Sequence, residues 1–216
     1  MDSSSSTSPN APIAGVHVIK VGGSWLLLPH AATELRRWLD SPAATPEATR
    51  VLLIGGGPVV DGLRVIDHVH RFAPEVMHAA AIDAMDSNAR LLQGWLPRWR
   101  GTTQLAGVSG DGRPTDWLLA PGEWLRRSEP AAAGTRLAKG WDATSDSIAA
   151  RIAEGLGGRR TLLKRRRPPR GLRRDLRSLA RIGYVDQQLP AIARRLPGVE
   201  FVWPADPEPE GASCRT

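Results

Sequence analysis

The sequence predicts an α/β protein, a three-layer sandwich in which helices cover a mainly parallel central sheet. Two observations support this prediction. Apolar, β-branched runs at residues 15–21 and 50–54 each end in a glycine turn, and a helical pattern follows each turn. Such a repeated strand–turn–helix order is typical of a parallel sheet covered by helices. Ligands bind such sheets at the carboxyl ends of the strands, where both glycine turns occur.

Each further element follows from apolar periodicity and from turn residues. Beyond the first two strands, we expect strands at 103–108, 116–119, 160–164 and 199–203. We expect helices at 29–39, from residue 58 onward, and at 74–96, 144–156 and 186–195. Pro29 and Pro58 suit a first helical turn, and the glycine pair at 157–158 is a typical helix end.

Composition narrows the class of protein. The 216 residues suit one domain, which we place at 13–204 between a disordered tail at 1–12 and a polar tail at 205–216. No apolar run reaches the roughly 18–20 residues that span a bilayer, and the Ser-rich opening is unlike a signal peptide. The single cysteine, Cys214, excludes a disulfide framework. We therefore expect a cytoplasmic protein without membrane contact.

The positive charge of the chain is local. The net charge is +7, but residues 159–181 hold eleven of the 29 Lys and Arg and one of the 22 acids. The rest of the chain has 18 basic and 21 acidic residues. An arginine run of this kind is compatible with nucleic-acid phosphates, with a site for ATP phosphates or with a solvated face. No aromatic residue interrupts the run, which argues against a nucleic-acid partner.

Two glycine-rich turns carry the first chemical signal. In Lys20-Val-Gly-Gly-Ser24 a strand ends in glycines whose N–H groups can bind a phosphate oxygen, and Lys20 can reach the same anion. Gly55-Gly56-Gly57 ends the second strand, at an entropic cost that close approach to a ligand would justify. Each turn alone is also compatible with an ordinary strand-to-helix connection. Together they favour one anionic ligand shared by both turns.

A third motif, Trp141-Asp-Ala-Thr-Ser-Asp146, leads into the helix expected at 144–156. Thr144, Ser145 and Asp146 are residue types preferred at helix N-termini, so capping alone would explain them. Asp142 adds more acid than a cap requires. Because carboxylates beside a phosphate site can position lysines or magnesium, the motif is also compatible with a catalytic role.

These three motifs, followed by a Leu-Leu-Lys strand, resemble the amino acid kinase family, which includes acetylglutamate, aspartate and uridylate kinases. The resemblance spans roughly residues 16–165. It implies transfer of the γ-phosphoryl group of ATP, with Mg²⁺, to a carboxylate, phosphate or similar acceptor. The helix from Met77 to Leu92, with His70, is similar to short kinases of methanofuran-type cofactor biosynthesis. Those enzymes phosphorylate an aminomethylfuran-methyl phosphate in tetrahydromethanopterin-linked one-carbon metabolism.

The resemblance implies a role for each motif residue. Lys20 would contact the ATP phosphates, and Asp146 would orient the catalytic lysines. The residues implied to bind the nucleotide are Gly22, Gly23, Ser24, Gly55, Gly56, Thr144 and Ser145. Those implied to face the acceptor are Gly57, Asp61, His70 and Asn88, with Asp61 as a partner for a substrate amine.

The chain departs from the family pattern in one respect. Members generally carry a second lysine downstream of the Ser-Asp helix, which stabilises the leaving phosphate, and then an acidic nucleotide-binding loop. Here Lys164 is the only downstream lysine, and the loop reads Arg165-Arg-Arg-Pro-Pro-Arg170. Either Lys164, which we take as the third catalytic residue, or an arginine fills that role. Otherwise the chain is an inactive relative.

Several alternatives stay open. The acceptor is alternatively that of a uridylate or acylglutamate kinase, or the chain is a non-catalytic module that binds nucleic acid through its arginines. The resemblance also implies a homodimer or a larger homo-oligomer. The histidines lack zinc-site spacing and a cysteine partner, so we expect no metal site built from protein ligands alone. His78 is expected to be packed or solvated, and Trp95 and Trp99 to pack in the core rather than line an acceptor pocket.

Overall fold

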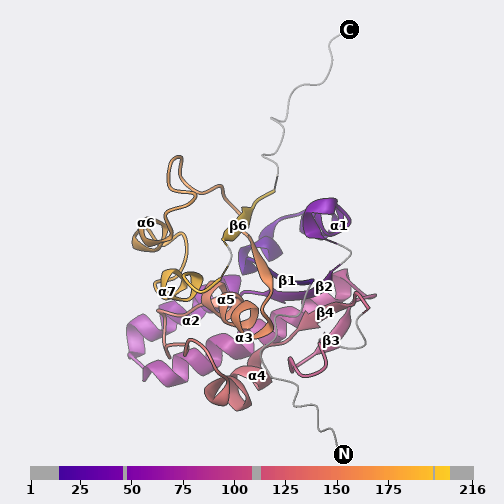
Figure 1. Cartoon of the computed structure of the whole chain (residues 1–216). Coiled ribbons are helices and arrows are strands. Elements are labelled where there is room, and N and C mark those ends of the chain that lie inside the picture. Colours follow the sequence, from indigo (N-terminus) through magenta and orange to yellow (C-terminus); the bar gives the residue numbers. More distant parts are fainter. Residues whose placement is uncertain (1–14, 46–47, 109–112, 197, 205–216) are drawn as a thin grey trace, which may run out of the picture.

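The computed structural model describes residues 15–45, 48–108, 113–196 and 198–204. The expected tails at 1–12 and 205–216 therefore lie outside the described residues. Six parallel strands form one sheet in the order β3-β4-β2-β1-β5-β6, and helices lie on both of its faces (Figure 1). The strands are β1 (Val16–Val21), β2 (Thr49–Ile54), β3 (Arg100–Thr102), β4 (Asp116–Leu119), β5 (Arg159–Leu163) and β6 (Val199–Val202).

Alternating apolar side chains on the central strands divide the core into two layers. Val18 of β1 and Val51 of β2 are buried on the face that α5 (Ser145–Leu156) covers. Ile19 of β1 and Leu52 of β2 are buried on the opposite face. β1 lies at the centre, paired with β2 and β5, so its last residues are enclosed on both sides.

The helices complete the two outer layers (Figure 1). Those that connect the strands are α1 (Ala31–Leu39), α2 (Gly57–His70), α3 (Pro74–Trp95), α4 (Gly122–Arg127), α6 (Leu176–Arg181) and α7 (Leu189–Ala193). The 3-10 helices are η1 (Gly23–Leu27), η2 (Pro42–Ala44) and η3 (Glu129–Ala131). No helix among the described residues is long and apolar enough to cross a membrane.

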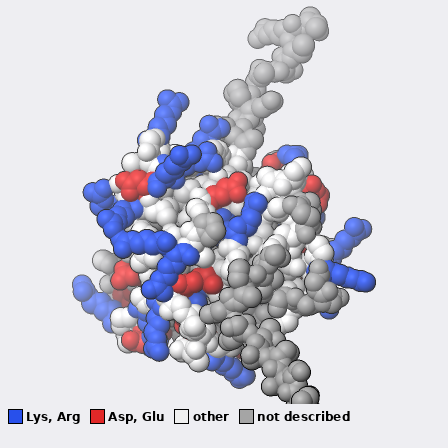
Figure 2. Space-filling view, viewed as in Figure 1, with Lys and Arg blue, Asp and Glu red and all other residues white. Residues whose placement is uncertain are grey.

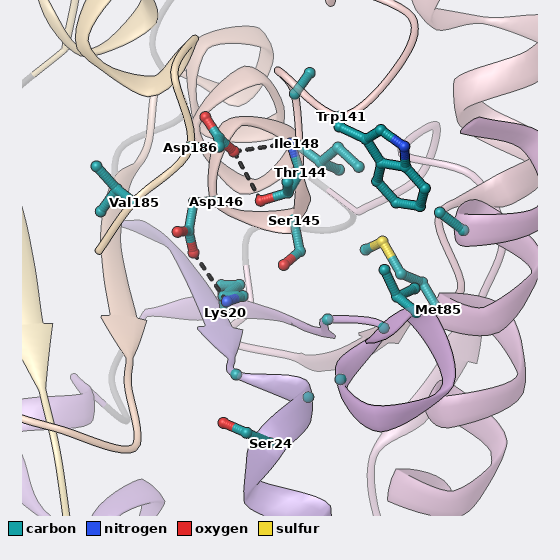
Figure 3. Close-up of a pocket in the computed structure, with 18 of the residues that line it drawn as sticks. Lys20, Ser24, Met85, Trp141, Thr144, Ser145, Asp146, Ile148, Val185 and Asp186 are labelled. Atoms are coloured by element: carbon teal, nitrogen blue, oxygen red, sulfur yellow. Dashed lines mark hydrogen bonds and ion pairs between the residues drawn. The ribbon is translucent and has the colours of Figure 1, made fainter. Parts of the chain in front are cut away.

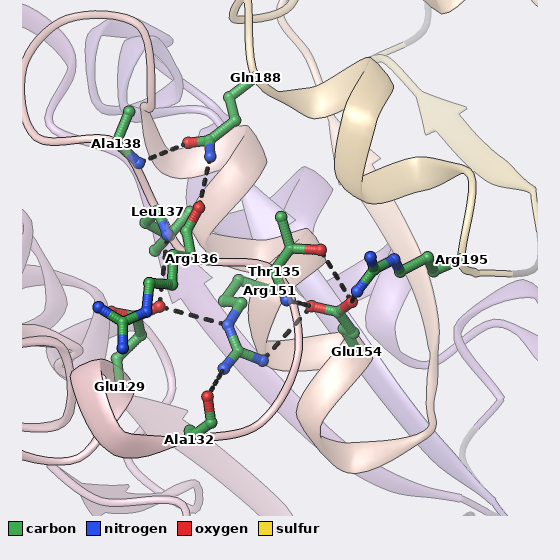
Figure 4. Close-up of polar contacts among 10 residues, drawn as sticks. All are labelled: Glu129, Ala132, Thr135, Arg136, Leu137, Ala138, Arg151, Glu154, Gln188 and Arg195. Atoms are coloured by element: carbon green, nitrogen blue, oxygen red, sulfur yellow. Dashed lines mark hydrogen bonds and ion pairs between the residues drawn. The ribbon is translucent and has the colours of Figure 1, made fainter.

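A buried arginine in α5 anchors the segment that leads to the third motif (Figure 4). Arg151 is fully buried and pairs with Glu129 at 3.3 Å and with Glu154 at 3.4 Å. Further along the segment, the backbone N–H of Ala138 donates to the side chain of Gln188 over 2.9 Å. Polar contacts with α5 at one end and with the start of α7 at the other therefore hold residues 129–138 in place.

The expected fold class is confirmed, and most elements lie within a few residues of their expected positions. The strand expected at 103–108 is wrong: β3 is at Arg100–Thr102, and the hydroxyl of Thr102 then donates to the carbonyl of Gln104 in a turn. The helix expected at 186–195 is shortened to α7. Its first residues form no helical turn, because the carboxylate of Asp186 instead binds the start of α5. The helices α4 and α6 were not expected.

Candidate active site

The carboxyl ends of β1, β2 and β5 meet at a cavity of about 430 Å³ (Figure 3). Both glycine turns line one side of it, and the start of α5 lines another. The helices α2 and α3 form a further wall, and the segments around Trp141, Lys164 and Tyr184 complete the lining. The three motifs that are far apart in the sequence therefore surround a single space.

Two lysines share one carboxylate in this cavity. Lys20, near the end of β1, places its Nζ 2.8 Å from Oδ1 of Asp146, and Lys164, directly after β5, places its Nζ 2.5 Å from Oδ2. The Nζ of Lys164 also donates to the backbone carbonyl of Tyr184 over 2.7 Å. Lys20 and Asp146 are 5% and 3% exposed. Because two ammonium groups face one carboxylate, the cluster keeps a net positive charge that a further anion can neutralise.

The charges of the cluster depend on one another. Burial alone would raise the pKa of Asp146, but attraction to Lys164 and Lys20 outweighs it and lowers that pKa to about 2. Burial lowers the pKa of Lys164, although Asp146 opposes the shift. Burial and the charge of Asp146 raise the pKa of Tyr184 to about 12. Asp146 is therefore an anion at any ordinary pH and holds the two lysines in place.

The glycine turns pack so closely that side chains cannot enter between them. A Cβ on Gly23 would lie 2.3 Å from the backbone nitrogen of Gly57, which itself has a φ of +52°. A Cβ on Gly55 would lie 2.6 Å from Oγ of Ser145. Asn88 of α3 fixes the second turn from below, since its amide donates to the carbonyl of Gly55 over 2.8 Å. Backbone, and not side chain, therefore forms this wall of the cavity.

The start of α5 is capped by a residue from outside the motif. Thr144 occupies the N-cap position, but its side chain makes no capping hydrogen bond. Instead the carboxylate of Asp186 accepts hydrogen bonds from the N–H and the hydroxyl of Thr144 and from the N–H of Ser147. The capping role that the sequence suggested for Thr144 therefore belongs to a distant aspartate.

The wall opposite the lysines combines apolar side chains with one aromatic ring (Figure 3). Val60 of α2, and Ile82 and Met85 of α3, line the cavity next to Trp141. The indole N–H of Trp141 donates to the carboxylate of Asp67 over 2.8 Å. This hydrogen bond fixes the ring at the edge of the cavity.

Charged groups of α2 stand at the rim of this wall. The guanidinium of Arg64 lies 5.0 Å from the centre of the Trp141 ring and 2.8 Å from the carboxylate of Asp61. All three residues line the cavity. His78 lines it as well, and burial lowers the pKa of its imidazole. This end of the cavity can therefore contact a ring, an anion and a cation.

Most of the residues that the sequence singled out line this cavity. The exceptions among the motif residues are His70, Asn88 and Asp142, which is exposed. His70 ends α2 on the exposed surface, where its ring lies 5.7 Å from that of Phe72. Asn88 is buried beneath the second glycine turn and supports its backbone. Trp95 and Trp99 pack in the apolar layer on the other face of the sheet, as expected.

Several residues that line the cavity belong to none of the sequence motifs. Arg64, Tyr184 and Asp186 belong to it through tertiary contacts. Arg64 follows Asp61 by three residues, and residues with this spacing lie on the same side of a helix. The expected position of Asp61 at the site therefore indicated Arg64 as well. No local pattern marks Asp186, which reaches the site across a long separation in sequence.

The arginine-rich segment 165–181 lies beside the cavity but is mostly outside it. Figure 2 shows basic side chains gathered on the side of the molecule that carries α6. Arg165 lines the cavity, while Arg167 and Arg173 lie 5.5 and 5.2 Å from the ring of Trp203. Lys164 and the arginines of residues 165–170 were the candidates for the second catalytic lysine of the family. Of these, Lys164 forms the ion pair with Asp146.

Comparison with known proteins gives a fold but no sequence relative. No protein-family model and no curated protein matches the chain. Among solved structures, uridylate kinase from Archaeoglobus fulgidus aligns with a TM-score of 0.57. The alignment covers 88% of this chain and 90% of that one. This chain has the fold of the uridylate kinases.

A second structure supports the same conclusion. UMP kinase from Bacillus anthracis aligns with a TM-score of 0.55 over 89% of this chain and 88% of that one. The sequence identities are 15% for the archaeal and 14% for the bacterial protein, so the likeness concerns the fold. The likeness extends over the parallel sheet and the helices on both of its faces.

Proposed function

We propose that this chain is an ATP-dependent kinase of the amino acid kinase type, which transfers the γ-phosphoryl group to a small phosphorylated or acidic acceptor. The observation that carries the proposal is the placement of Asp146 between Lys20 and Lys164, facing two backbone-lined glycine turns. The fold shared with uridylate kinases supports it. We place the reaction in the cytoplasm.

Phosphoryl transfer requires positioning and neutralisation of charge more than covalent chemistry from the protein. Lys20 and Lys164 approach from two strands and would contact phosphate oxygens on either side of the transferred group. Asp146 prevents their mutual repulsion from separating them. The N–H groups at the glycine turns and at the start of α5 would bind the remaining oxygens. Of the residues expected to bind the nucleotide, Gly23, Ser24, Gly56 and Ser145 line the cavity and would supply these N–H groups. The N–H groups of Gly22, Gly55 and Thr144 already donate to the carbonyls of Leu163 and Val21 and to the carboxylate of Asp186.

Magnesium fits this site as a companion of the nucleotide. Both carboxylate oxygens of Asp146 are held by lysines, and the part of the chain that the structure describes has no group of three potential metal ligands. The ion would therefore be bound mainly through phosphate oxygens. When bound, it neutralises charge on the β- and γ-phosphates.

The favoured acceptor is an aminomethylfuran-methyl phosphate. Trp141 and Met85 both line the cavity and would pack against a flat ring, and the carboxylate of Asp61 would bind an amine. The guanidinium of Arg64 and the N–H of Gly57 can bind the acceptor phosphate. A nucleoside monophosphate is the second candidate, because the structural neighbours are uridylate kinases.

A nucleotide-binding experiment tests the proposal first. Thermal unfolding of the wild type and of Lys20→Ala would be followed with Mg-ATP, Mg-ADP and Mg-GTP. The matched control is Lys139→Ala, because Lys139 is exposed and does not line the cavity. A nucleotide at 100 times its Kd adds about 2.7 kcal/mol to the free energy of unfolding. We expect this gain in the wild type and Lys139→Ala, and its loss in Lys20→Ala.

An activity assay then identifies the acceptor. ADP release would be measured with aminomethylfuran-methyl phosphate, UMP and acetylglutamate, and ³¹P NMR would show whether a diphosphate or an acyl phosphate forms. No stabilisation by any nucleotide would contradict the kinase proposal and favour the alternative, a module that binds nucleic acid through residues 165–181. That module would retain nucleic acid equally well with Lys20→Ala.

A further inference from the structure

The segment 165–181 exposes a group of arginines that lack acidic partners. It carries eight arginines, and all eight are exposed. We refer to these eight side chains as the arginine face. Apart from Arg167, none of them forms an ion pair with a carboxylate in the part of the chain that the structure describes. Arginines elsewhere in the fold do so, as Arg50 does with Asp116 at 2.7 Å and Arg126 with Asp83 at 2.9 Å.

Few acids of the chain are available to neutralise the arginine face. Asp175 is the only acid within the segment, and its carboxylate accepts hydrogen bonds from the N–H and the hydroxyl of Ser178 in α6. Asp206, Glu208 and Glu210 follow β6 in the sequence, outside the described residues. If all four acids were paired with arginines, eight minus four would still leave four positive charges. This remaining charge is available to an anion from outside the chain.

The arginine face is built on an anchored loop. The hydroxyl of Tyr184 donates to the carbonyl of Arg166 over 2.8 Å, and Leu172 packs against the apolar core. The N–H of Asp175 donates to the carbonyl of Leu172 over 2.8 Å. Because the backbone is already held in place, the binding of a partner requires less loss of conformational entropy.

An aromatic ring from another element joins the arginine face. Trp203 lies directly after β6, and the centre of its ring is 5.5 Å from the guanidinium of Arg167 and 5.2 Å from that of Arg173. The lack of aromatic residues within the run argued against a nucleic-acid partner, but the fold supplies the missing ring. Tryptophan stabilises neighbouring guanidinium groups through cation–π contacts. Aromatic rings and arginines are also the groups on which unpaired bases stack.

The chemistry of the arginine face favours a phosphate polymer with unpaired bases. Guanidinium groups bind phosphate oxygens in a bidentate manner. Ile182 is the only exposed large apolar side chain between residues 165 and 183, which leaves little to insert into a membrane. The helix of the segment, α6, has six residues and is short for reading the groove of a duplex.

We propose that the arginine face and Trp203 bind single-stranded nucleic acid. The guanidinium groups would contact successive phosphates, and a base would stack beside Trp203 and Arg173. Figure 2 shows basic side chains gathered on the side that carries α6. Of the eight arginines, Arg165 lines the cavity of the candidate active site and the others do not. The nucleic acid would therefore bind next to the proposed kinase site, and its binding does not require phosphoryl transfer.

Fluorescence anisotropy with a labelled oligouridylate of about 20 nucleotides tests the proposal. The variant combines Arg173→Ser with Arg174→Ser, because neither residue lines the cavity. We expect the wild type to bind the oligomer, with log Kd rising by about 0.7 per phosphate contact for each unit of log salt concentration. In the variant, Kd should rise about tenfold or more and its salt dependence should become weaker.

The chain offers a matched control at the opposite edge of the sheet. Arg100 begins β3, is exposed, and lies 4.8 Å from the ring centre of Trp117, much as Arg173 lies beside Trp203. Arg98 is exposed as well, so Arg98→Ser with Arg100→Ser removes the same charge. Six strands about 4.8 Å apart separate the two edges by roughly 24 Å, which exceeds the Debye length of about 8–10 Å. The control should therefore bind within about twofold of the wild type.

Replacement of Trp203 tests stacking separately from charge. In Trp203→Leu we expect Kd to rise about tenfold with little change in the salt dependence, because no phosphate contact is removed. Trp203→Phe keeps an aromatic ring and should restore most of the affinity. Circular dichroism would establish that each variant is folded. Wild-type binding by Trp203→Leu would exclude the ring from the proposed site.

Three other results would overturn the proposal. They are no binding of the oligomer by the wild type, an equal loss of affinity in the arginine variant and its control, and equally tight binding of polyglutamate or phosphatidylserine vesicles. The last result would indicate an acidic protein or a membrane as the partner. Thermal stabilisation by Mg-ATP is a separate measurement, and its absence would contradict the kinase proposal but not this one.

Discussion

Asp186 accepts a hydrogen bond from the backbone N–H of Ser147 over 2.9 Å, from a position 39 residues further along the chain. The same carboxylate binds the N–H of Thr144 over 2.8 Å. These donors belong to the first turn of α5, which a helix cannot satisfy by itself. Because Asp146 lies in that turn, Asp186 also fixes the carboxylate that holds the two lysines.

Removal of this cap should destabilise the protein strongly. Asp186→Ala leaves several buried donors without an acceptor, and we expect the free energy of unfolding to fall by about 2–4 kcal/mol. The control is Asp175→Ala, which removes the exposed local cap of α6 and should cost about 1 kcal/mol. Urea denaturation measures both values, and equal losses would show that Asp186 is an ordinary surface cap.

Asp146 should be required for catalysis by its charge. Asp146→Asn keeps the shape but leaves Lys20 and Lys164 facing each other without an anion, so we expect kcat to fall by about 10²–10³. Asp142→Asn, in the exposed segment four residues earlier, is the matched control and should retain nearly full activity. Steady-state ADP release distinguishes them; wild-type activity in Asp146→Asn would remove this residue from the mechanism.

The space around two glycines predicts opposite effects of alanine substitution on stability. Gly23→Ala would place a methyl group 2.3 Å from the backbone of Gly57, so we expect loss of stability and of nucleotide binding. Gly94→Ala, in an exposed position of α3 with no atom within 4 Å of the new Cβ, should stabilise the protein by up to about 1 kcal/mol. Thermal unfolding of both variants would measure these effects; a neutral Gly23→Ala would mean that the turns are further apart in solution.

His17 predicts a loss of stability in acid. Burial lowers the pKa of its imidazole from 6.5 to about 4, and the ring lies between the carbonyl of Ala44 and the hydroxyl of Thr161. The folded state thus favours the neutral ring, so this contribution is complete above pH 6.5 and is lost as the pH falls toward 4. Its full size is up to about 3 kcal/mol.

Titration of the histidine ring resonances by NMR measures this shift directly. The ring of His17 should titrate near pH 4. A midpoint of His17 near 6.5 would contradict the buried, neutral ring. Urea denaturation between pH 7 and pH 4.5 should show the corresponding fall in the free energy of unfolding.

The fold and much of the candidate site could be predicted because their signals are local. Apolar runs that end in glycines specify strands and the turns that follow them, whatever their neighbours. Because parallel strands bring such turns to one edge of the sheet, the sequence was enough to predict that Lys20 and the Gly55–Gly57 turn lie close together. The Ser-Asp motif at the start of α5 is a local signal as well, because its residue types are those preferred at helix N-termini.

His70 shows where local patterns fail. His70 follows the second glycine turn by only 13 residues in the sequence. These residues form the helix α2, which has 14 residues and rises about 1.5 Å for each, so His70 is roughly 20 Å from Gly57. Trp141 shows the converse. Nothing in its own segment indicates that Asp67 and Arg64 of α2 would hold its ring beside the cavity.

Local patterns were enough to predict the central strands, their glycine turns and the location of the arginine run, because each depends on residues close together in the chain. Three relationships required the three-dimensional fold: the contact of Lys164 with Asp146, the cap that Asp186 gives to α5, and the exposed apolar side chains of α2. Those relationships join residues from separate elements. Their geometry is set by packing of the whole sheet, which short-range patterns do not contain.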